Sequence, residues 1–314
     1  MVPQAAKSRS AGLLCSLVIL VLLPLTARGQ VQSAHGPAQG TDPTVHAQLD
    51  LPEPKNSALP NLFLVGDSTV RNGRGDGANG QWGWGEPLAD FFDPAKINVV
   101  NRAIGGRSSR TYITEGHWQE VLNLLKPGDF ILIQFGHNDS GPLDDSSRAR
   151  GTLPGTGEET KEIENPILKR HEVVHTYGWY MRQYVQLARG HGATIIVCSL
   201  IPRKIWNDGH VVRSGADGYG GWAKEIAREE HVPFIDLNEI IGRRYDAMGE
   251  RAVEPLFADP HTHTSLRGAQ MNAEAVITGL KLLHPDPLAP YFSGKAAEVP
   301  ASMPAAVPQR LSGS

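Results

Sequence analysis

The chain has 314 residues, and its 30 lysines and arginines nearly balance its 33 aspartates and glutamates, for a net charge of −3 at pH 7. No long basic stretch accompanies this balance, which argues against a nucleic acid as partner. The segment from residue 59 to residue 284, about 225 residues, has a suitable length for one α/β domain with its own core.

The first residues are typical of a secretory signal peptide. Lys7 and Arg9 precede an apolar core from about residue 11 to 25, and a small-x-small cleavage site follows at 27–29. We therefore expect residues 1–29 to be removed and the mature protein to be secreted, starting near Gln30.

Two other fates of this segment stay open. An uncleaved membrane anchor is disfavoured because the apolar run is short for a bilayer and contains Pro24. A lipid anchor on Cys15 is disfavoured because this cysteine lies inside the apolar run, so no stable membrane association is expected.

Once the segment is removed, Cys198 is the only thiol, which excludes an intramolecular disulfide. The apolar neighbours of Cys198 indicate a buried side chain and not a catalytic thiol.

Composition divides the rest of the chain into three parts. Residues 30–58 and 285–314 lack apolar periodicity, which predicts a poorly ordered linker and tail around a domain at 59–284. Short apolar runs predict strands at 61–65, 97–101, 129–135, 194–200 and 233–237. Helical spacing predicts helices at 109–125, 172–189, 216–230 and 267–283. This alternation predicts an α/β fold, a three-layer doubly wound (flavodoxin-like) sheet of about five parallel strands, with ligands at the carboxyl ends of the strands.

A long polar segment, residues 139–170, follows the third predicted strand at this ligand-binding edge. Loops of such length in compact domains are usually either functional or disordered. We expect this one to be an insertion that covers the substrate.

The first predicted strand ends abruptly on the turn Gly66-Asp67-Ser68-Thr69. A serine at the carboxyl end of a strand presents its hydroxyl and its backbone N–H at the edge where ligands bind. The position of Ser68 is therefore that of a nucleophile.

An acid and two imidazoles precede the last predicted helix, in Asp259-Pro260-His261-Thr262-His263. They are sufficient to supply the base that a serine hydroxyl needs. A metal site on the same side chains is the alternative, but transition metals normally need three or four protein ligands and no second spaced cluster exists. We expect neither a metal nor a cofactor.

Two further strand ends supply hydrogen-bond donors for an oxyanion. Gly106 follows the second predicted strand, and Asn138 follows the third. Together with the Ser68 N–H, the Gly106 N–H and the Asn138 amide are the three candidate donors of an oxyanion hole.

These four segments, in this order, resemble the four sequence blocks of the SGNH (GDSL) hydrolase superfamily. More narrowly, Gly66–Thr69, Gly106–Thr111, Gly136–Asp139 and His261–Ser265 resemble the rhamnogalacturonan acetylesterases, which remove acetyl groups from pectin. The resemblance covers about residues 61–282. It implies the SGNH hydrolase fold, Ser68 as nucleophile, and Gly106 and Asn138 beside it in the oxyanion hole.

The spacing of the acid and the base departs from the family. The family places two residues between Asp and His, whereas three residues separate Asp259 from His263. The His-Thr-x-x-x-Gly context aligns His263 with the catalytic position, so we predict Asp259 and His263 as the remaining triad residues and keep His261 as the alternative.

Four residues near these segments are candidates for substrate binding. Trp82 and Trp84 follow the nucleophile and are suited to stacking on a sugar ring, although packing is an equally good explanation. Arg107 and Arg110 are suited to pairing with the uronate carboxylates of a pectic chain, against the alternative of an ordinary salt bridge.

The sequence therefore predicts a secreted, monomeric serine esterase that acts on an acetylated polysaccharide, with rhamnogalacturonan as the first candidate. An acetylxylan esterase or another small-acyl esterase of the same fold is the nearest alternative. A pectin-binding protein without catalytic activity is the alternative from another class, and the altered acid spacing is the one feature in its favour.

Overall fold

The structure, a computed structural model, describes residues 51–307. The predicted signal peptide, most of the predicted linker and the last seven residues lie outside the described residues. Between residues 51 and 307, no helix is both long enough and apolar enough to cross a membrane.

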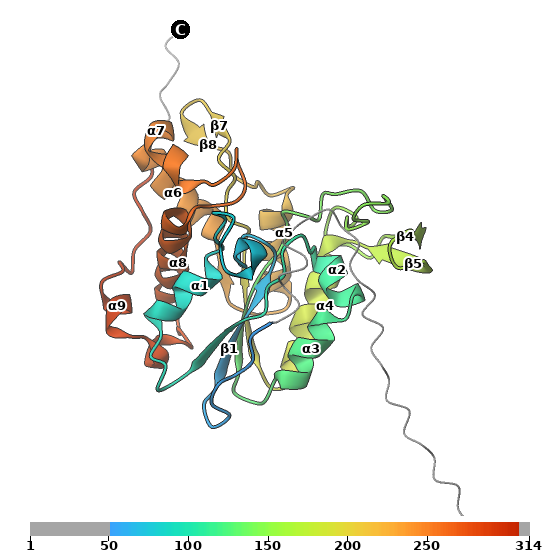
Figure 1. Cartoon of the computed structure of the whole chain (residues 1–314), viewed down its shortest axis with the longest axis horizontal. Coiled ribbons are helices and arrows are strands. Elements are labelled where there is room, and N and C mark those ends of the chain that lie inside the picture. The colour runs from blue at the N-terminus through green and yellow to red at the C-terminus, as the bar shows by residue number, and fades with distance from the viewer. Residues whose placement is uncertain (1–50, 308–314) are drawn as a thin grey trace, which may run out of the picture. The chain divides into compact units, whose positions relative to one another are not determined.

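Five parallel strands form the central sheet (Figure 1). They are β1 (Asn61–Gly66), β2 (Asn98–Asn101), β3 (Phe130–Gln134), β6 (Thr194–Cys198) and β9 (Phe234–Ile235). Their order is β2-β1-β3-β6-β9, which confirms the doubly wound prediction. Because the chain leaves β1 toward β2 and returns to β3 on the other side, the strand order reverses at β1, where such sheets bind ligands.

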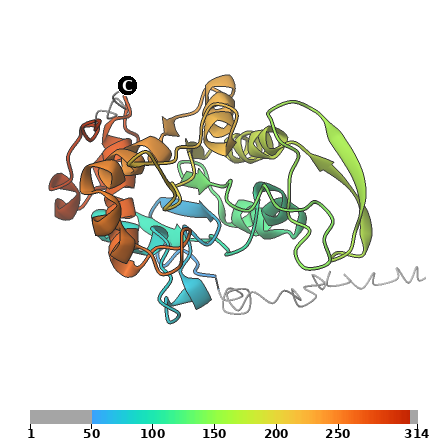
Figure 2. The same ribbon diagram turned by 90° about the horizontal axis from the view of Figure 1, so that it is seen from above.

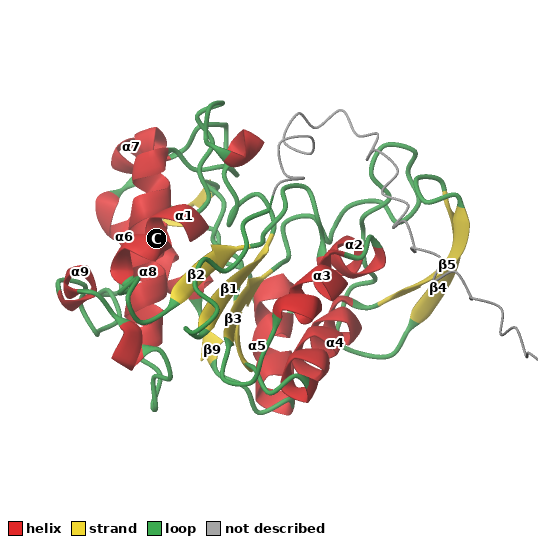
Figure 3. Cartoon of the chain, turned by 60° about the horizontal axis from the view of Figure 1, so that its bottom comes forward, coloured by secondary structure: helices red, strands yellow, loops and turns green. Residues whose placement is uncertain are grey.

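Helices cover both faces of this sheet (Figure 3). One face carries α2 (Ser109–Thr114), α3 (His117–Leu124), α4 (Tyr177–Gly190) and α5 (Tyr219–Glu229), and the other carries α1 (Gly85–Leu88), α6 (Leu237–Met248) and α8 (Leu266–Lys281). The shorter helices are α7 (Glu250–Val253), α9 (Gly294–Ala297) and the 3₁₀ turns Gly73–Gly75, Ala89–Phe91, Glu254–Leu256 and Ala289–Tyr291.

Alternate residues of each strand enter two separate cores. In β1, Leu62 and Leu64 pack toward α8, while Phe63 and Val65 pack toward α4. The buried thiol of Cys198 belongs to the first of these cores, and burial raises its pKa. Because both faces of each strand are covered, the strands are continuous apolar runs, which is why the sequence predicted them well.

The helices differ from the prediction in three places. The predicted helix at 109–125 is broken at Gly116, whose φ of 90° lies in the left-handed region. The predicted helix at 172–189 begins only at Tyr177, because the Thr176 side chain caps it by accepting a hydrogen bond from the Trp179 N–H. Helix α6 was not predicted.

A β-hairpin occupies the second half of the predicted loop at 139–170 and continues beyond it. Strands β4 (Thr160–Asn165) and β5 (Arg170–His175) pair antiparallel, and Figure 2 shows them at one side of the domain. In β5, Val173 is 40% exposed and Val174 is fully buried, which is strand alternation and not the helical face expected there.

The start of the C-terminal segment belongs to the domain. The sequence predicted a poorly ordered tail from residue 285, but Leu288, Ala296 and Val299 are buried in the core beside α8. The ammonium group of Lys281 donates to the carbonyl oxygens of Ala296 and Val299. The ordered part of the chain therefore extends beyond the predicted boundary.

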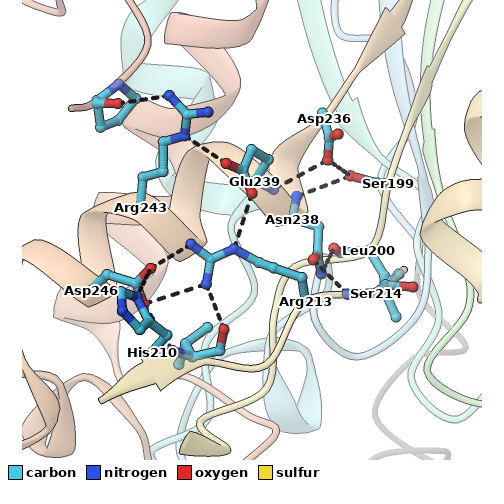
Figure 4. A network of polar contacts seen from close by, with 12 residues as sticks. Ser199, Leu200, His210, Arg213, Ser214, Asp236, Asn238, Glu239, Arg243 and Asp246 are labelled. Atoms are coloured by element: carbon cyan, nitrogen blue, oxygen red, sulfur yellow. Dashed lines mark hydrogen bonds and ion pairs between the residues drawn. The ribbon is translucent and has the colours of Figure 1, made fainter. Parts of the chain in front are cut away.

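An ion-pair network fastens the segment after β6 to α6 (Figure 4). This segment contains the short hairpin of β7 (Trp206–Asn207) and β8 (His210–Val211). The Arg213 guanidinium contacts Asp246 at 2.7 Å and Glu239 at 3.1 Å, and Asp246 also accepts a hydrogen bond from the Val211 N–H. The network fixes a loop that begins at the ligand-binding edge of the sheet.

Candidate active site

Ser68 lies on a tight turn directly after β1. Asp67 forms this turn because its carboxylate accepts hydrogen bonds from the Thr69 N–H and hydroxyl, both at 2.8 Å. Gly66 is required before it, since a Cβ there would lie 2.6 Å from a methyl carbon of Val70 and 2.7 Å from the carbonyl oxygen of Gln134. The turn leaves Ser68 partly exposed at the carboxyl edge of the sheet.

The structure brings Ser68, His263 and Asp259 together in one hydrogen-bonded chain. The Ser68 Oγ lies 2.8 Å from His263 Nε2, and His263 Nδ1 contacts Asp259 Oδ2. An ionised Asp259 accepts a hydrogen bond, so Nδ1 carries the proton and Nε2 is left to accept the serine proton. His261 is exposed, with its Nδ1 on the Thr262 hydroxyl, and makes no contact with Ser68.

The extra residue between acid and base is accommodated by a turn around Asp259. Its Oδ1 accepts the N–H groups of His261, Thr262 and His263 at 3.0, 2.7 and 3.1 Å. Partial burial raises the pKa of Asp259, but these hydrogen bonds and the His263 ring outweigh it and hold the pKa below its usual value. Asp259 is therefore ionised at neutral pH.

Thr264 holds this turn against the loop that follows Ser68. Its carbonyl oxygen accepts the Trp82 N–H at 2.8 Å, and its hydroxyl donates to the Trp82 carbonyl oxygen at 2.7 Å. These two bonds fix the relative positions of His263 and Ser68, which come from opposite ends of the chain. Sequence reasoning gave Thr264 no such role.

The segments that carry the predicted oxyanion donors are bonded to the end of β1 and to each other. Gly106 adopts φ 76°, a conformation that favours glycine, in a loop joined to β1 by the Ile104 N–H bond to the Gly66 carbonyl oxygen. The Asn138 amide donates one of its two N–H groups to the Arg107 carbonyl oxygen at 2.8 Å, which fixes its orientation. Within residues 51–307, the N–H groups of Ser68 and Gly106 donate to no acceptor, as donors that serve a bound oxyanion should.

Two buried titratable groups form the floor of the site. Burial lowers the pKa of His137 to about 4 despite the nearby Asp67 carboxylate. Burial, reinforced by the charge of Asp67, raises the pKa of Asp139 to about 7, although hydrogen bonds from Ser109 at 2.5 and 3.0 Å oppose the rise. At neutral pH His137 is therefore uncharged, and Asp139 is partly protonated.

The Asp139 carboxyl is expected to make stability fall as pH rises. Its pKa is about 3.9 in an unfolded chain, so the folded protein binds this proton more tightly, and the free energy of unfolding decreases between about pH 4 and pH 7. Asp139→Asn should remove a decrease of roughly 1–3 kcal/mol between pH 5 and pH 8, measured by urea unfolding. His137, whose pKa is lowered, contributes a pH dependence of stability of the opposite sign. Both proteins retain His137, so the difference between them isolates the contribution of Asp139. An equal pH dependence in both proteins would contradict the assignment.

Two of the four predicted substrate-binding side chains are completely buried. Trp84 has no exposed surface and donates its indole N–H to Gln134 at 3.0 Å and its backbone N–H to Thr69, so it packs against the Ser68 turn. Arg110 also has no exposed surface and forms a two-point ion pair with Glu172. Neither can touch a polysaccharide in this arrangement, so both predictions are corrected to structural roles.

The other two candidates differ from each other. Arg107 is 8% exposed, and its guanidinium is bound to Glu115 at 2.8 Å, which is the ordinary salt bridge that the sequence offered as the alternative to substrate binding. Trp82 is partly exposed beside the His263 turn, so stacking of its indole on a sugar remains a prediction.

Among the described residues, no group of three or more His, Cys, Asp or Glu side chains is placed to hold a metal ion.

Sequence reasoning also missed Arg203, which follows β6 at the ligand-binding edge. Its Nη2 donates to the carbonyl oxygen of His137 at 3.1 Å, and its Nε lies 3.5 Å from His137 Nδ1. The only signal in the sequence is an arginine shortly after the fourth predicted strand, which no motif marks.

Comparison with known proteins identifies the family of the chain. The GDSL-like lipase/acylhydrolase family model matches residues 64–271. The chain is 31% identical over 217 residues to the rhamnogalacturonan acetylesterase of Emericella nidulans, covering 69% of this chain and 82% of that protein. It is 34% identical over 227 residues to the probable rhamnogalacturonan acetylesterase YesY of Bacillus subtilis, covering 71% and 93%.

A solved structure shares the fold. The crystal structure of the YxiM protein of Bacillus subtilis superposes with a TM-score of 0.56 at 23% identity, covering 71% of this chain and 56% of that one. The family match spans more than half of the chain and includes the Ser68 turn. The chain therefore belongs to the GDSL-like lipase/acylhydrolase family and is a carboxylic ester hydrolase.

Proposed function

We propose that this chain is a serine esterase that removes acetyl groups from a plant cell-wall polysaccharide, with rhamnogalacturonan as the preferred substrate. The observation that carries the serine chemistry is the 2.8 Å contact between Ser68 Oγ and His263 Nε2, with Asp259 behind the imidazole. The two relatives named as rhamnogalacturonan acetylesterases support the choice of substrate.

In the first half of the reaction, Ser68 Oγ attacks the acetyl carbonyl carbon while its proton passes to His263 Nε2. The carbonyl oxygen becomes an oxyanion, which accepts hydrogen bonds from the Ser68 and Gly106 N–H groups and the Asn138 amide. The intermediate then collapses, His263 gives its proton to the departing sugar oxygen, and the acetyl group stays on Ser68.

The second half repeats these steps with water as the nucleophile. His263 takes a proton from the water that attacks the acetyl-serine, and the same donors hold the second oxyanion. Collapse releases acetate and restores the Ser68 hydroxyl. The ionised Asp259 keeps the imidazole in one tautomer and stabilises its positive charge in both halves.

The alternatives predict different substrate profiles, so a panel of substrates distinguishes them. We expect the protein to hydrolyse 4-nitrophenyl acetate and to release acetate faster from acetylated rhamnogalacturonan than from acetylated xylan at equal acetyl concentration. Faster acetate release from acetylated xylan would make xylan the substrate and leave the proposed serine-esterase chemistry in place. Binding of the pectic polymer without turnover of any ester would instead support a protein without catalytic activity.

We also propose that the protein acts outside the cytoplasm, after removal of residues 1–29. The support is the pattern of a basic start, an apolar core and a small-x-small site. Amino-terminal sequencing of the protein expressed from its full-length gene should find a start near Gln30. An intact Met1 on the active protein would refute this proposal.

A further inference from the structure

Arg203 lies between two parts of the active site. Its guanidinium contacts the carbonyl oxygen and ring of His137, which follows β3 at the floor of the site. The next residue, Lys204, donates its backbone N–H at 2.9 Å to the carbonyl oxygen of His261, in the turn that carries the catalytic His263. Arg203 is half-buried, so part of its side chain faces solvent beside the reacting groups.

The charge of Arg203 is not neutralised within the described residues. Arg107, Arg110 and Arg213 each contact a carboxylate at 2.7 to 2.8 Å, whereas no carboxylate of residues 51–307 pairs with Arg203. Its contact partner His137 is uncharged at neutral pH, since burial lowers the pKa of that ring to about 4. Its Nη1 donates to no acceptor in the described part of the chain. A half-buried guanidinium of this kind attracts an anion.

The segment that carries Arg203 is held in place. The Val212 N–H donates to the Ile205 carbonyl oxygen at 2.8 Å, which closes the segment into a loop. The Arg213–Asp246 network of Figure 4 fastens the far end of this loop to α6. A guanidinium positioned before substrate arrives loses less conformational entropy on binding an anion.

We propose that Arg203 binds a carboxylate of the polysaccharide, on the uronate that carries the acetyl ester or on one near it, and that this contact selects acidic chains over neutral ones. The proposal rests on the proposed function and deepens it. Guanidinium groups pair with carboxylates through two parallel hydrogen bonds, and Arg203 adjoins both His137 and the turn that carries His263. A neutral acetylated xylan offers this group no partner.

The test compares two forms of one acetylated rhamnogalacturonan, with its uronates as free acids or as methyl esters. The readout is the ratio of kcat/KM for acetate release from the acid form to that from the ester form. We expect the wild type to prefer the acid form about tenfold, and Arg203→Gln to lower this ratio to about one. Arg203→Lys should keep only part of the preference. The positive charge remains, but the planar guanidinium that makes two parallel hydrogen bonds is lost.

A ratio measured on one preparation does not depend on how much of a variant is folded. Arg228→Gln is the matched control, since Arg228 is exposed in the last turn of α5, at the opposite edge of the sheet, and should retain the wild-type ratio. Equal rates on both forms by the wild type, or an unchanged ratio in Arg203→Gln, would overturn the role of Arg203 and leave the proposed substrate in place. Turnover of 4-nitrophenyl acetate without acetate release from either polymer would overturn the proposed substrate, and this role with it.

Discussion

Replacing His263 with alanine is expected to lower ester hydrolysis by a factor of about 10⁴ to 10⁶, comparable to the effect of Ser68→Ala. Without the imidazole, nothing takes the proton from the Ser68 hydroxyl, 2.8 Å from Nε2 in the intact chain. Because the two side chains act as one unit, the double variant should be hardly worse than either single variant. Initial rates with 4-nitrophenyl acetate and with the acetylated polymer measure all three.

His261→Ala is the matched control for this prediction. It removes the same ring two residues earlier, from an exposed position where the ring Nδ1 contacts the Thr262 hydroxyl. We expect it to change the rate on 4-nitrophenyl acetate by less than about threefold. A large loss with His261→Ala and a small one with His263→Ala would reverse the assignment of the base. Thermal unfolding of each variant shows whether a loss of rate reflects a loss of fold.

The order and type of the main elements could be predicted because each signal is local. The strands are short apolar runs buried on both faces, so composition alone indicates β1 and β3. The turn after β1 is also local, since Gly66 is needed for space and Asp67 bonds to a residue two positions later. His263 was selected by its own sequence context, and the structure places its ring, not that of His261, at Ser68.

The roles of Trp84 and Arg110 depend on partners far away in the sequence. Gln134 lies 50 positions after Trp84, and Glu172 lies 62 positions after Arg110. A single sequence contains no signal that pairs such residues, so exposed arginines and tryptophans cannot be told from buried ones. The start of the helix expected at 172–189 was wrong for a related reason, since residues 172–175 are a strand only because β4 pairs with them.

Arg110→Ala is expected to have the largest effect on stability, because it breaks a buried ion pair. The Arg110 side chain is 0% exposed and Glu172 7%, and two hydrogen bonds of 2.8 Å join them. The variant leaves the Glu172 carboxylate buried with the Asn165 amide as its remaining hydrogen-bond donor, which typically costs about 3–5 kcal/mol. The free energy of unfolding from urea titration measures this loss. Arg189→Ala removes an exposed pair with Glu230 and should cost less than about 1 kcal/mol.

Arg110 also organises the insertion beside the active site. Its Nη1 donates to the carbonyl oxygens of Leu143 and Gly151 at 3.0 and 2.8 Å, so one guanidinium joins α2 to the hairpin and to the loop before it. Arg110→Ala should therefore increase amide hydrogen exchange most strongly at 140–175.

If the pair matters only for stability, replacing Arg110 with Met and Glu172 with Leu should recover much of the unfolding free energy, since a well-packed apolar pair can match a buried ion pair. Recovery of stability without recovery of acetate release from the polymer would show that the guanidinium's bonds to the loop are needed to shape the substrate-binding side of the site.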